Sequence, residues 1–375
     1  YQDPERKKLG EQYLKEAYDK GLSGDEAIVE AQKKLKPATE CMDVPDNAYS
    51  DGANVLEACD ILKTLGNDDK PFFFAVGFSK PHLPFVAPKR YWDLYKREDM
   101  PLAPFQKPAA NAISIAYHNA GELRAYTDIE PIIPSEQDSI GVTLSVEKQK
   151  ELIHGYYAAV SYTDAQIGKL LRTLDSMHLR ENTIIILWGD HGWHLGDHNL
   201  WTKHTDFEQA THVPMIIAAP GMKPSVVNRT TEFVDIFPTL CALAGVNVPS
   251  QLEGKPLDKL MSNPSATFKE YAVSQYPRSG PQKETQRLGY ADAEYMGYSF
   301  RNERYRFTIW MKNRFRSFEH FEDSKVFGME LYDYQKDPLE TVNVANDKKY
   351  AEVFNKMKTD AIAFFNTEEK KYQKH

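Results

Sequence analysis

Two short segments of the chain gather the residue types that bind and transform anions. The first is Gly189-Asp190-His191-Gly192, directly after the apolar run from Ile184 to Trp188. A carboxylate beside an imidazole can ligate a divalent cation, and a hard ion such as Ca²⁺ needs further oxygen ligands from elsewhere. Lys203 follows twelve residues after His191. A lysine within a metal-binding loop typically meets an anion that the metal also holds.

The second segment is Ser79-Lys80-Pro81-His82-Leu83-Pro84, which follows the apolar run from Pro71 to Gly77. Its two prolines predict an extended conformation, in which residues two apart point to the same side. Lys80 and His82 could then face one anion together. The alternatives are an exposed lysine with a packed histidine here, and a simple capping pair at a strand end for Asp190 and His191.

A divalent cation, two lysines and a histidine together describe a site for a tetrahedral oxyanion. Such groups stabilise the charge that builds on a transferring sulfuryl or phosphoryl group. Hydrolysis of a sulfate or phosphate ester is therefore the predicted class of reaction.

These residues need elements that bring them to one place. Apolar runs predict strands at Ile184–Trp188 and Val213–Ala219, on either side of the loop that carries Asp190 and Lys203. Pro71–Gly77 is predicted as a strand buried on both faces. Helical periodicity covers Ala53–Leu65 and Glu147–Met177. Helices alternating with buried strands favour an α/β fold, in which ligands bind beyond the carboxyl ends of the strands.

The pattern of the chain changes near residue 262. From there, alternating and aromatic-rich segments predict an antiparallel sheet that is followed by a closing helix. We therefore expect a larger α/β domain over residues 1–261 and a smaller α+β subdomain over 262–375. The chain opens with two further predicted helices within residues 1–36. The predicted C-terminal elements are strands at 272–276, 296–301, 305–310 and 330–333, and a helix at 350–365.

Composition narrows the classes of function. The 375 residues carry a net charge of -8, which argues against a general nucleic-acid binder. No apolar run reaches the ~18 residues that a membrane-spanning helix needs. The three cysteines, Cys41, Cys59 and Cys241, form no metal motif and no clear disulfide framework.

The ordered set of motifs resembles the type I, formylglycine-dependent sulfatases, and most of all their iduronate-2-sulfatase branch. The resemblance covers nearly the whole chain from about Pro37 onward. It is carried by Val44-Pro45-Asp46 through Asp51-Gly52, AVGFSKPHLPF (75–85), YYAAVSYTDAQIG (156–168), GDHGWHLGDHNLWTKHTDFEQATHVPMI (189–216), VDIFPTLCALAG (234–245), SQYPR (274–278), MGYSFRNERYRFTIW (296–310) and ELYDYQKDPLETVNV (330–344).

The resemblance implies a fold like that of alkaline phosphatase. Such a fold has a mostly parallel central sheet flanked by helices, and a smaller C-terminal antiparallel sheet with a closing helix. It also implies one bound Ca²⁺ and hydrolysis of a sulfate ester. By motif match, Asp190 and His191 correspond to metal ligands. Lys80, His82 and Lys203 correspond to catalytic residues that contact the sulfate, and His82 also aids departure of the leaving group.

The same resemblance implies the residues that bind the sugar. Trp193, His194 and His198 lie in the metal loop and are expected to line the sugar pocket. Arg278 and Arg301 are expected to meet a sugar carboxylate or a second sulfate.

Two features of the family are missing from the sequence. The formylglycine of the family is made from Cys or Ser in a motif of the form C/S-x-P/A-x-R, and none of the three cysteines fits it. The first pair of metal-binding aspartates is also missing. We expect both on an N-terminal segment of roughly 100–200 residues of the same protein, which would complete the site.

The prediction is an exo-acting carbohydrate sulfatase that is secreted, periplasmic or lysosomal. Its substrate would be a sulfated sugar near a carboxylate, from glycosaminoglycan fragments or from algal polysaccharides such as ulvan. One alternative is a phosphodiesterase or phosphonate hydrolase of the same superfamily. Another is a non-catalytic module that binds sulfated glycans.

Overall fold

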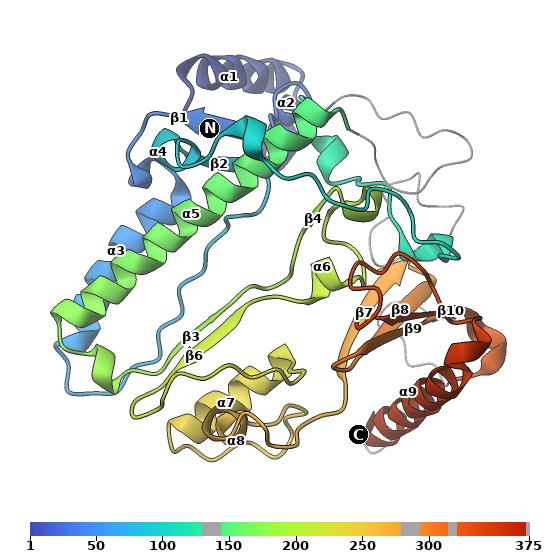
Figure 1. Cartoon of the computed structure of the whole chain (residues 1–375). Helices are drawn as coiled ribbons and strands as arrows, with labels where there is room; N and C mark the ends of the chain where they lie inside the picture. Colours follow the sequence, from blue (N-terminus) through green and yellow to red (C-terminus); the bar gives the residue numbers. More distant parts are fainter. Residues whose placement is uncertain (130–143, 279–292, 314–320, 373–375) are drawn as a thin grey trace. The chain divides into compact units, whose positions relative to one another are not determined.

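The computed structural model describes residues 1–129, 144–278, 293–313 and 321–372 (Figure 1). The described chain forms two compact units. The first contains residues 1–104, 120–129 and 144–183, and the second contains residues 105–119 and the described residues from 184 onward. The predicted domain boundary at residue 261 stays a prediction.

The first unit begins with a helical hairpin, as the sequence predicts. Helix α1 spans Pro4–Asp19 and α2 spans Gly24–Gln32. The carboxylate of Asp3 caps α1 by accepting hydrogen bonds from the backbone N–H groups of Glu5 and Arg6. Such a cap satisfies N–H groups that have no partner within the helix.

The main layer of the first unit is a pair of long helices beside a short parallel sheet (Figure 1). The predicted helices are confirmed as α3, Ser50–Gly66, and α5, Val146–Ser176, which pack together. Their core continues onto β1, Thr39–Met42, which pairs in parallel with β2, Phe85–Pro88, and onto the short helix α4, Lys89–Trp92.

Gly52, near the start of α3, is required by packing. A Cβ there would lie 2.1 Å from the carbonyl oxygen of Asp46. Without a side chain, the Gly52 N–H donates to the hydroxyl of Tyr162 at 2.6 Å, which ties α3 to α5.

The prediction of a buried strand at Pro71–Gly77 is wrong. The segment joins no sheet in the described chain, and Phe73 is 81% exposed. An apolar run becomes a buried strand only where other elements pair with it and cover it. The β-propensity of the run is not sufficient to form a buried strand without such elements.

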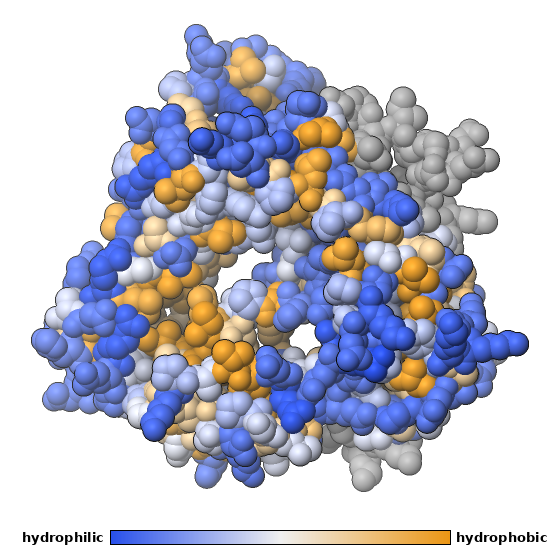
Figure 2. Space-filling model, in the orientation of Figure 1, coloured by the Kyte–Doolittle hydropathy of each residue, from blue (hydrophilic) through white to orange (hydrophobic). Residues whose placement is uncertain are grey.

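The second unit opens with a two-stranded ribbon. Strand β3, Ile185–Trp188, pairs antiparallel with β6, Met215–Ala218, and both strands lie where the sequence predicts them. Between them are the β4–β5 pair, His194–Leu195 with Trp201–Thr202, and the short helix α6, Glu208–Thr211. The ribbon exposes large apolar side chains, and Figure 2 shows hydrophobic surface over the stretch that β3 and β6 occupy in Figure 1.

Two helices follow the ribbon. Helix α7 spans Ile236–Leu243, within the motif at 234–245, and α8 spans Asp258–Ser262. The turn before α7 is closed by a capping box between Glu232 and Asp235. Among the described helices, no segment is long and apolar enough to cross a membrane.

The second unit ends in a four-stranded antiparallel sheet of order β10-β9-β8-β7, as predicted. Its strands are β7 Ala272–Arg278, β8 Tyr295–Arg301, β9 Tyr305–Lys312 and β10 Val326–Asp333. Helix α9, Ala351–Tyr372, closes it by packing apolar side chains against the sheet. The α/β class, the small antiparallel sheet and the C-terminal helix are therefore confirmed. Among the described strands of the larger part, one pair is parallel and two are antiparallel.

Candidate active site

A cavity of about 340 Å³ opens in the second unit where several of the predicted site residues meet. Asp190 and His191 reach it from the end of β3, and Lys203 reaches it from the loop after β5. The cavity is named the pocket below. Its other lining residues, which the sequence did not single out, are His204, Thr205, Asp206, Ala210, Thr211, Phe233, Ser274, Gln275 and Tyr276.

Asp190 and His191 place a carboxylate and an imidazole, both possible metal ligands, at the rim of the pocket. The Asp190 side chain is 86% exposed, and its Oδ2 lies 3.6 Å from Nε2 of His191. Calcium takes six to eight oxygen ligands. Within the described chain no group of three or more His, Cys, Asp and Glu side chains could hold a metal ion. The pair fits part of a cation's ligand shell, and the other ligands would have to come from elsewhere.

Gly192 fixes the loop that carries this pair. A Cβ at Gly192 would lie 1.9 Å from the carbonyl oxygen of Gln209. The close approach lets the Gly192 N–H donate to the carbonyl of Ala210 at 2.8 Å. The loop after β3 is thereby attached to the backbone of α6.

Lys203 and Trp193 lie together beside the pocket. The Lys203 Nζ is 4.9 Å from the centroid of the Trp193 ring, within cation–π range. The Trp193 ring is in turn 6.0 Å from the ring of His191. The predicted sulfate and sugar roles of Lys203 and Trp193 are thus compatible with their placement and stay predictions.

His194 and His198 are buried in the interior of the second unit. His194 contacts the Asp197 carboxylate through Nδ1 and the Thr205 hydroxyl through Nε2, while His198 stacks on Phe207. Burial acts to raise the pKa of Asp197, but the two histidines outweigh it and hold the pKa below its usual range. Neither ring lines the pocket, so their predicted sugar-binding role finds no support in this geometry.

Arg278 is also buried, at 4% exposure, and binds main-chain carbonyls. Its guanidinium donates to the carbonyls of Ile115 at 2.9 Å, Ala116 at 3.3 Å and His204 at 2.6 Å. It also lies 4.5 Å from the centroid of the Tyr276 ring. These contacts hold the loop after Lys203 in place, and the predicted role of Arg278 in binding a sugar carboxylate or second sulfate stays a prediction.

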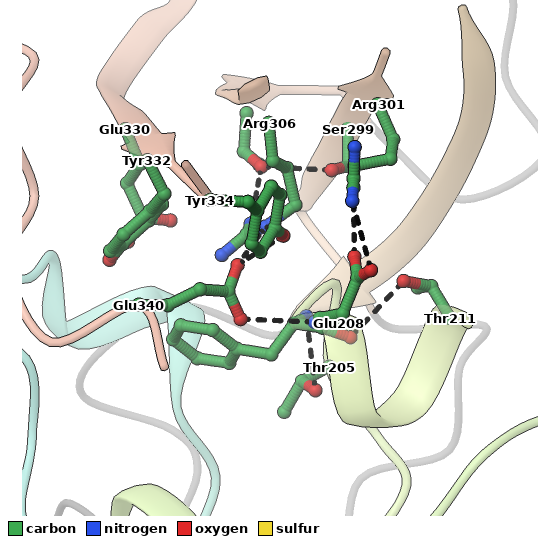
Figure 3. Close-up of polar contacts among 12 residues, drawn as sticks. Thr205, Glu208, Thr211, Ser299, Arg301, Arg306, Glu330, Tyr332, Tyr334 and Glu340 are labelled. Atoms are coloured by element: carbon green, nitrogen blue, oxygen red, sulfur yellow. Dashed lines mark hydrogen bonds and ion pairs between the residues drawn. The ribbon is translucent and has the colours of Figure 1, made fainter. Parts of the chain in front are cut away.

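Arg301 is turned toward α6. Its Nε and Nη2 donate to the two carboxylate oxygens of Glu208 at 2.9 and 3.1 Å, and its guanidinium stacks 3.9 Å from the Tyr334 ring centroid (Figure 3). A bidentate pair of this kind is geometrically specific. The predicted role of Arg301 in binding a substrate anion therefore has no geometric support, and its observed contacts anchor α6 to the sheet.

A second, fully buried ion pair lies behind Arg301. Arg306 bonds the Glu340 carboxylate, which also accepts from the Tyr334 hydroxyl at 2.7 Å and from the Glu208 N–H at 3.1 Å (Figure 3). The buried ion network is defined as Arg301, Glu208, Arg306 and Glu340. It connects the loop after Lys203 to β8, β9 and the segment that follows β10.

In the first unit, Lys80 is held by the protein's own main chain. Its Nζ donates to the carbonyls of His82 at 2.6 Å and Pro84 at 2.9 Å. Asp51, buried near the start of α3, accepts from the N–H groups of Ser79 and Lys80. Burial lowers the pKa of Lys80 to about 8, and the Asp51 charge opposes that shift.

His82 is held at both ring nitrogens. Its Nδ1 lies 2.7 Å from the carbonyl of Leu83, and its Nε2 lies 2.9 Å from the Glu122 carboxylate. The prediction that residues 80–82 are extended is wrong, because they form a turn in which the Lys80–Pro81 peptide bond is cis. The lysine amine and the imidazole consequently make separate contacts.

Three acidic residues near the predicted residues were not assigned a role by sequence reasoning. Asp51 lies in one of the motifs that carry the family resemblance. The sequence therefore marked its position but did not indicate its role. Glu122 lies in an irregular, proline-rich region with no periodicity to mark it. Asp206 was one charged residue among several in the long loop, and only burial distinguishes it.

Comparison with known proteins identifies the family. Residues 7–246 match the family described as Sulfatase, and residues 196–366 match the one described as N-sulphoglucosamine sulphohydrolase, C-terminal. The chain is 32% identical to iduronate 2-sulfatase from Homo sapiens over 380 residues, covering 87% of this chain and 67% of that protein. It therefore belongs to the sulfatase family of sulfuric ester hydrolases.

Two more distant likenesses complete the comparison. A Delta 4,5-hexuronate-2-O-sulfatase from Bacteroides thetaiotaomicron is 30% identical over 216 residues, covering 55% of this chain and 40% of that protein. A phosphonate monoester hydrolase from Silicibacter pomeroyi shares the fold with a TM-score of 0.66 and 21% identity, covering 95% of this chain and 68% of the other. The chain spans about half to two thirds of the length of the first curated relatives it matches.

Proposed function

We propose that this protein hydrolyses a sulfate ester on a sulfated sugar. The observation that carries the proposal is the convergence of Asp190, His191 and Lys203 on one pocket in a chain of the sulfatase family. A cationic lysine next to metal-binding side chains offers positive charge to a sulfate group. Such charge is most effective in the transition state, where the sulfate oxygens and the leaving oxygen become more negative.

Each of the predicted catalytic residues would have a separate role in the reaction. Lys203 binds the sulfate oxygens from the pocket, and the family resemblance implies a sulfate contact for Lys80 as well. His82 donates a proton to the sugar oxygen as the ester bond breaks. In the free protein the Nε2 of His82 contacts Glu122. Binding of the substrate would have to replace that contact.

A bound Ca²⁺ would be held in part by Asp190 and His191. The ion would supply positive charge that polarises the sulfate, as metal ions do in ester hydrolysis. The two side chains fit this role by chemistry and by proximity.

We also propose that a further segment of the same protein supplies the formylglycine nucleophile and the missing metal ligands. Support comes from the ribbon of β3 and β6, where Leu187, Trp188 and Ile216 are 36%, 45% and 60% exposed. Contiguous apolar surface of this kind usually binds another segment or partner. The expected segment would cover it.

The substrate proposed is a uronate that carries a 2-O-sulfate at a chain end. The names of two relatives, iduronate 2-sulfatase and Delta 4,5-hexuronate-2-O-sulfatase, support this class. A cavity of about 340 Å³ is at the small end of ligand sites and suits one sugar ring. Glycosaminoglycan fragments and ulvan oligosaccharides both contain sulfated units near a carboxylate. The secreted, periplasmic or lysosomal location stays a prediction.

A panel of defined sulfated oligosaccharides tests the proposal. Sulfate release from the full-length protein would be measured for terminal 2-O-sulfated uronates, internal sulfates and 6-O-sulfated hexosamines. We expect release only from the terminal uronate. Release from internal positions would contradict the exo-acting proposal, and binding without release from any substrate would favour the non-catalytic glycan-binding alternative.

A second candidate function is hydrolysis of phosphodiesters or phosphonate esters, favoured by the fold shared with the phosphonate monoester hydrolase. Parallel assays with para-nitrophenyl sulfate and para-nitrophenyl phenylphosphonate separate the two. A kcat/KM that is higher for the phosphonate would replace the sulfatase proposal.

A further inference from the structure

Asp51 lies near the start of α3 and holds the turn that carries Lys80. Only 2% of Asp51 is exposed. Its carboxylate accepts hydrogen bonds from the Ser79 N–H at 3.1 Å, the Ser79 hydroxyl at 2.9 Å and the Lys80 N–H at 2.8 Å. One acidic side chain therefore fixes two successive backbone groups that lie nearly thirty residues later in the chain.

Helix α5 contacts the same turn. The Thr163 hydroxyl lies 3.2 Å from the carbonyl oxygen of Lys80, within hydrogen-bonding distance. The start of α3 is itself tied to α5, because the N–H of Gly52 donates to the Tyr162 hydroxyl. The backbone of Lys80 is thus held at its N–H by α3 and at its carbonyl by α5, the two long helices of the first unit.

A backbone fixed in this way limits where the Lys80 amine can point. An ammonium group has three donors, and the carbonyls of His82 and Pro84 use two of them. One donor remains beyond those that the main chain uses, and Lys80 is not fully buried. The turn therefore presents a lysine whose backbone and amine are both set by named contacts.

The charge that acts on this amine comes from Asp51. Burial lowers the pKa of Lys80 to about 8, and the Asp51 carboxylate opposes that shift. From α5, the Thr163 hydroxyl that faces Lys80 carries no charge. Within the turn, the amine contacts carbonyls, and the ring of His82 meets the carboxylate of Glu122. Among the described groups, Asp51 is therefore the one whose removal would change the charge of Lys80 most.

A purely structural tie would not need a carboxylate at this position. The amide oxygen of an asparagine also accepts hydrogen bonds from N–H groups. Burying a charged group costs more than burying a neutral one unless another group compensates it. The negative charge of Asp51 offers what an amide would not, which is stabilisation of a neighbouring cation.

We propose that Asp51 is a positioning residue for sulfate binding, which sets the place of the Lys80 amine and keeps that amine charged near neutral pH. The proposal rests on the proposed function, in which Lys80 contacts the sulfate. Asp51 bonds the backbone of Lys80 and not the substrate, so it acts on the reaction only through that lysine.

The pH dependence of turnover by the full-length protein tests the proposal. In the wild type, kcat/KM for the sulfated disaccharide should fall above about pH 8, the pKa of Lys80. In Asp51→Asn burial acts without the opposing charge, so the decline should begin about one pH unit lower. At pH 8 that shift alone reduces kcat/KM about fivefold relative to the wild type. An unchanged midpoint would overturn the proposal, because loss of a structural tie lowers the rate equally at every pH.

Control variants separate the charge from hydrogen bonding and folding. Ser79→Ala removes one hydrogen bond to Asp51 and keeps the charge, so the midpoint should not move. Asp60→Asn makes the same substitution at an exposed aspartate of α3 and should leave both kcat/KM and the midpoint unchanged. Thermal melting checks the fold of each variant, and Asp51→Ser provides a second neutral side chain if Asp51→Asn does not fold. A midpoint that moves as far in Ser79→Ala as in Asp51→Asn would contradict the role of the charge.

The charge of Lys80 can also be measured without a substrate. Competitive labelling with acetic anhydride, followed by mass spectrometry of the peptide that contains Lys80, reports the pH at which the amine loses its proton. The pKa should be about 8 in the wild type and about one unit lower in Asp51→Asn. If the wild type hydrolyses no sulfate ester, the proposed function fails, and labelling still decides the effect of Asp51 on Lys80. Equal values in the two proteins would refute that effect.

Discussion

Two sets of charged residues lie in the second unit and differ in what surrounds them. The pocket has Asp190 open to solvent and Lys203 beside an aromatic ring, whereas the buried ion network encloses Arg306 and Glu340 completely. The network pairs each of its carboxylates with an arginine of the protein. The pocket instead directs its charges toward a space that a ligand can fill.

This difference predicts how structural and functional charges can be told apart, by whether a substitution changes stability or activity. In a buried network, removal of one partner leaves the other charge unpaired in a medium of low polarity, so the fold loses stability. In an open pocket, water replaces a missing side chain, so stability changes little and activity changes most. Each set of residues thus has its own experimental signature.

The largest expected effect comes from breaking the buried pair. Glu340→Gln should lower the free energy of unfolding by about 3–5 kcal/mol, because it leaves the Arg306 charge buried without a counter-ion. Urea unfolding measures the change. Glu303→Gln is the matched control, because Glu303 is half-exposed and its pair with Arg229 should contribute less than about 1 kcal/mol. Equal effects of the two changes would remove the distinction between buried and open charges.

The second effect is on activity. Lys203→Ala should reduce kcat/KM for the sulfated disaccharide by about 100-fold or more, the usual loss for one electrostatic contact to a transition state. Its free energy of unfolding should stay within about 0.5 kcal/mol of the wild type. Lys223→Ala, at an exposed lysine, is the control. A variant with near wild-type activity would disprove the assignment of Lys203.

The third test extends the comparison to Lys80, which is largely buried but proposed to act. Its pKa of about 8 means that the amine is charged below pH 8 and loses its proton above it. Turnover should therefore fall above about pH 8, approaching tenfold per pH unit. In Lys80→Arg the guanidinium stays charged at these pH values, so the decline should vanish from the residual activity. A decline that persists unchanged in that variant would point to another group.

The smallest expected effect concerns Arg301. Arg301→Lys loses the bidentate contact with Glu208, and the free energy of unfolding should fall by about 1 kcal/mol. The ratio of kcat/KM values for carboxylated and neutral sugar sulfates should not change. A selective loss for the carboxylated sugar would instead restore the substrate-binding role predicted from the sequence.

Much of the fold could be predicted from the sequence, because periodicity reports local structure directly. The runs at Ile184–Trp188 and Met296–Arg301 gave strands, and Glu147–Met177 gave the long helix. The run at Pro71–Gly77 had the same apolar character and failed. Burial of that run would need segments far away in the sequence to pair with it, and none of the described segments does.

The candidate site was predictable in its residue types but not in its contacts. Asp190, His191 and Lys203 were identified by type and spacing, and they line one pocket. The family resemblance assigned Arg278 and Arg301 to the substrate, and these assignments stay predictions, because a sequence shows that a charge is present and not what lies beside it. Their partners, His204 and Glu208, became evident only in the fold.

The sequence by itself determined the family, the order of the elements and the residues able to bind an anion, since these follow from local pattern and motif. The tertiary structure decided which charges are buried and paired, and which face the pocket. Burial is the reason, because it sets the cost of an unpaired charge.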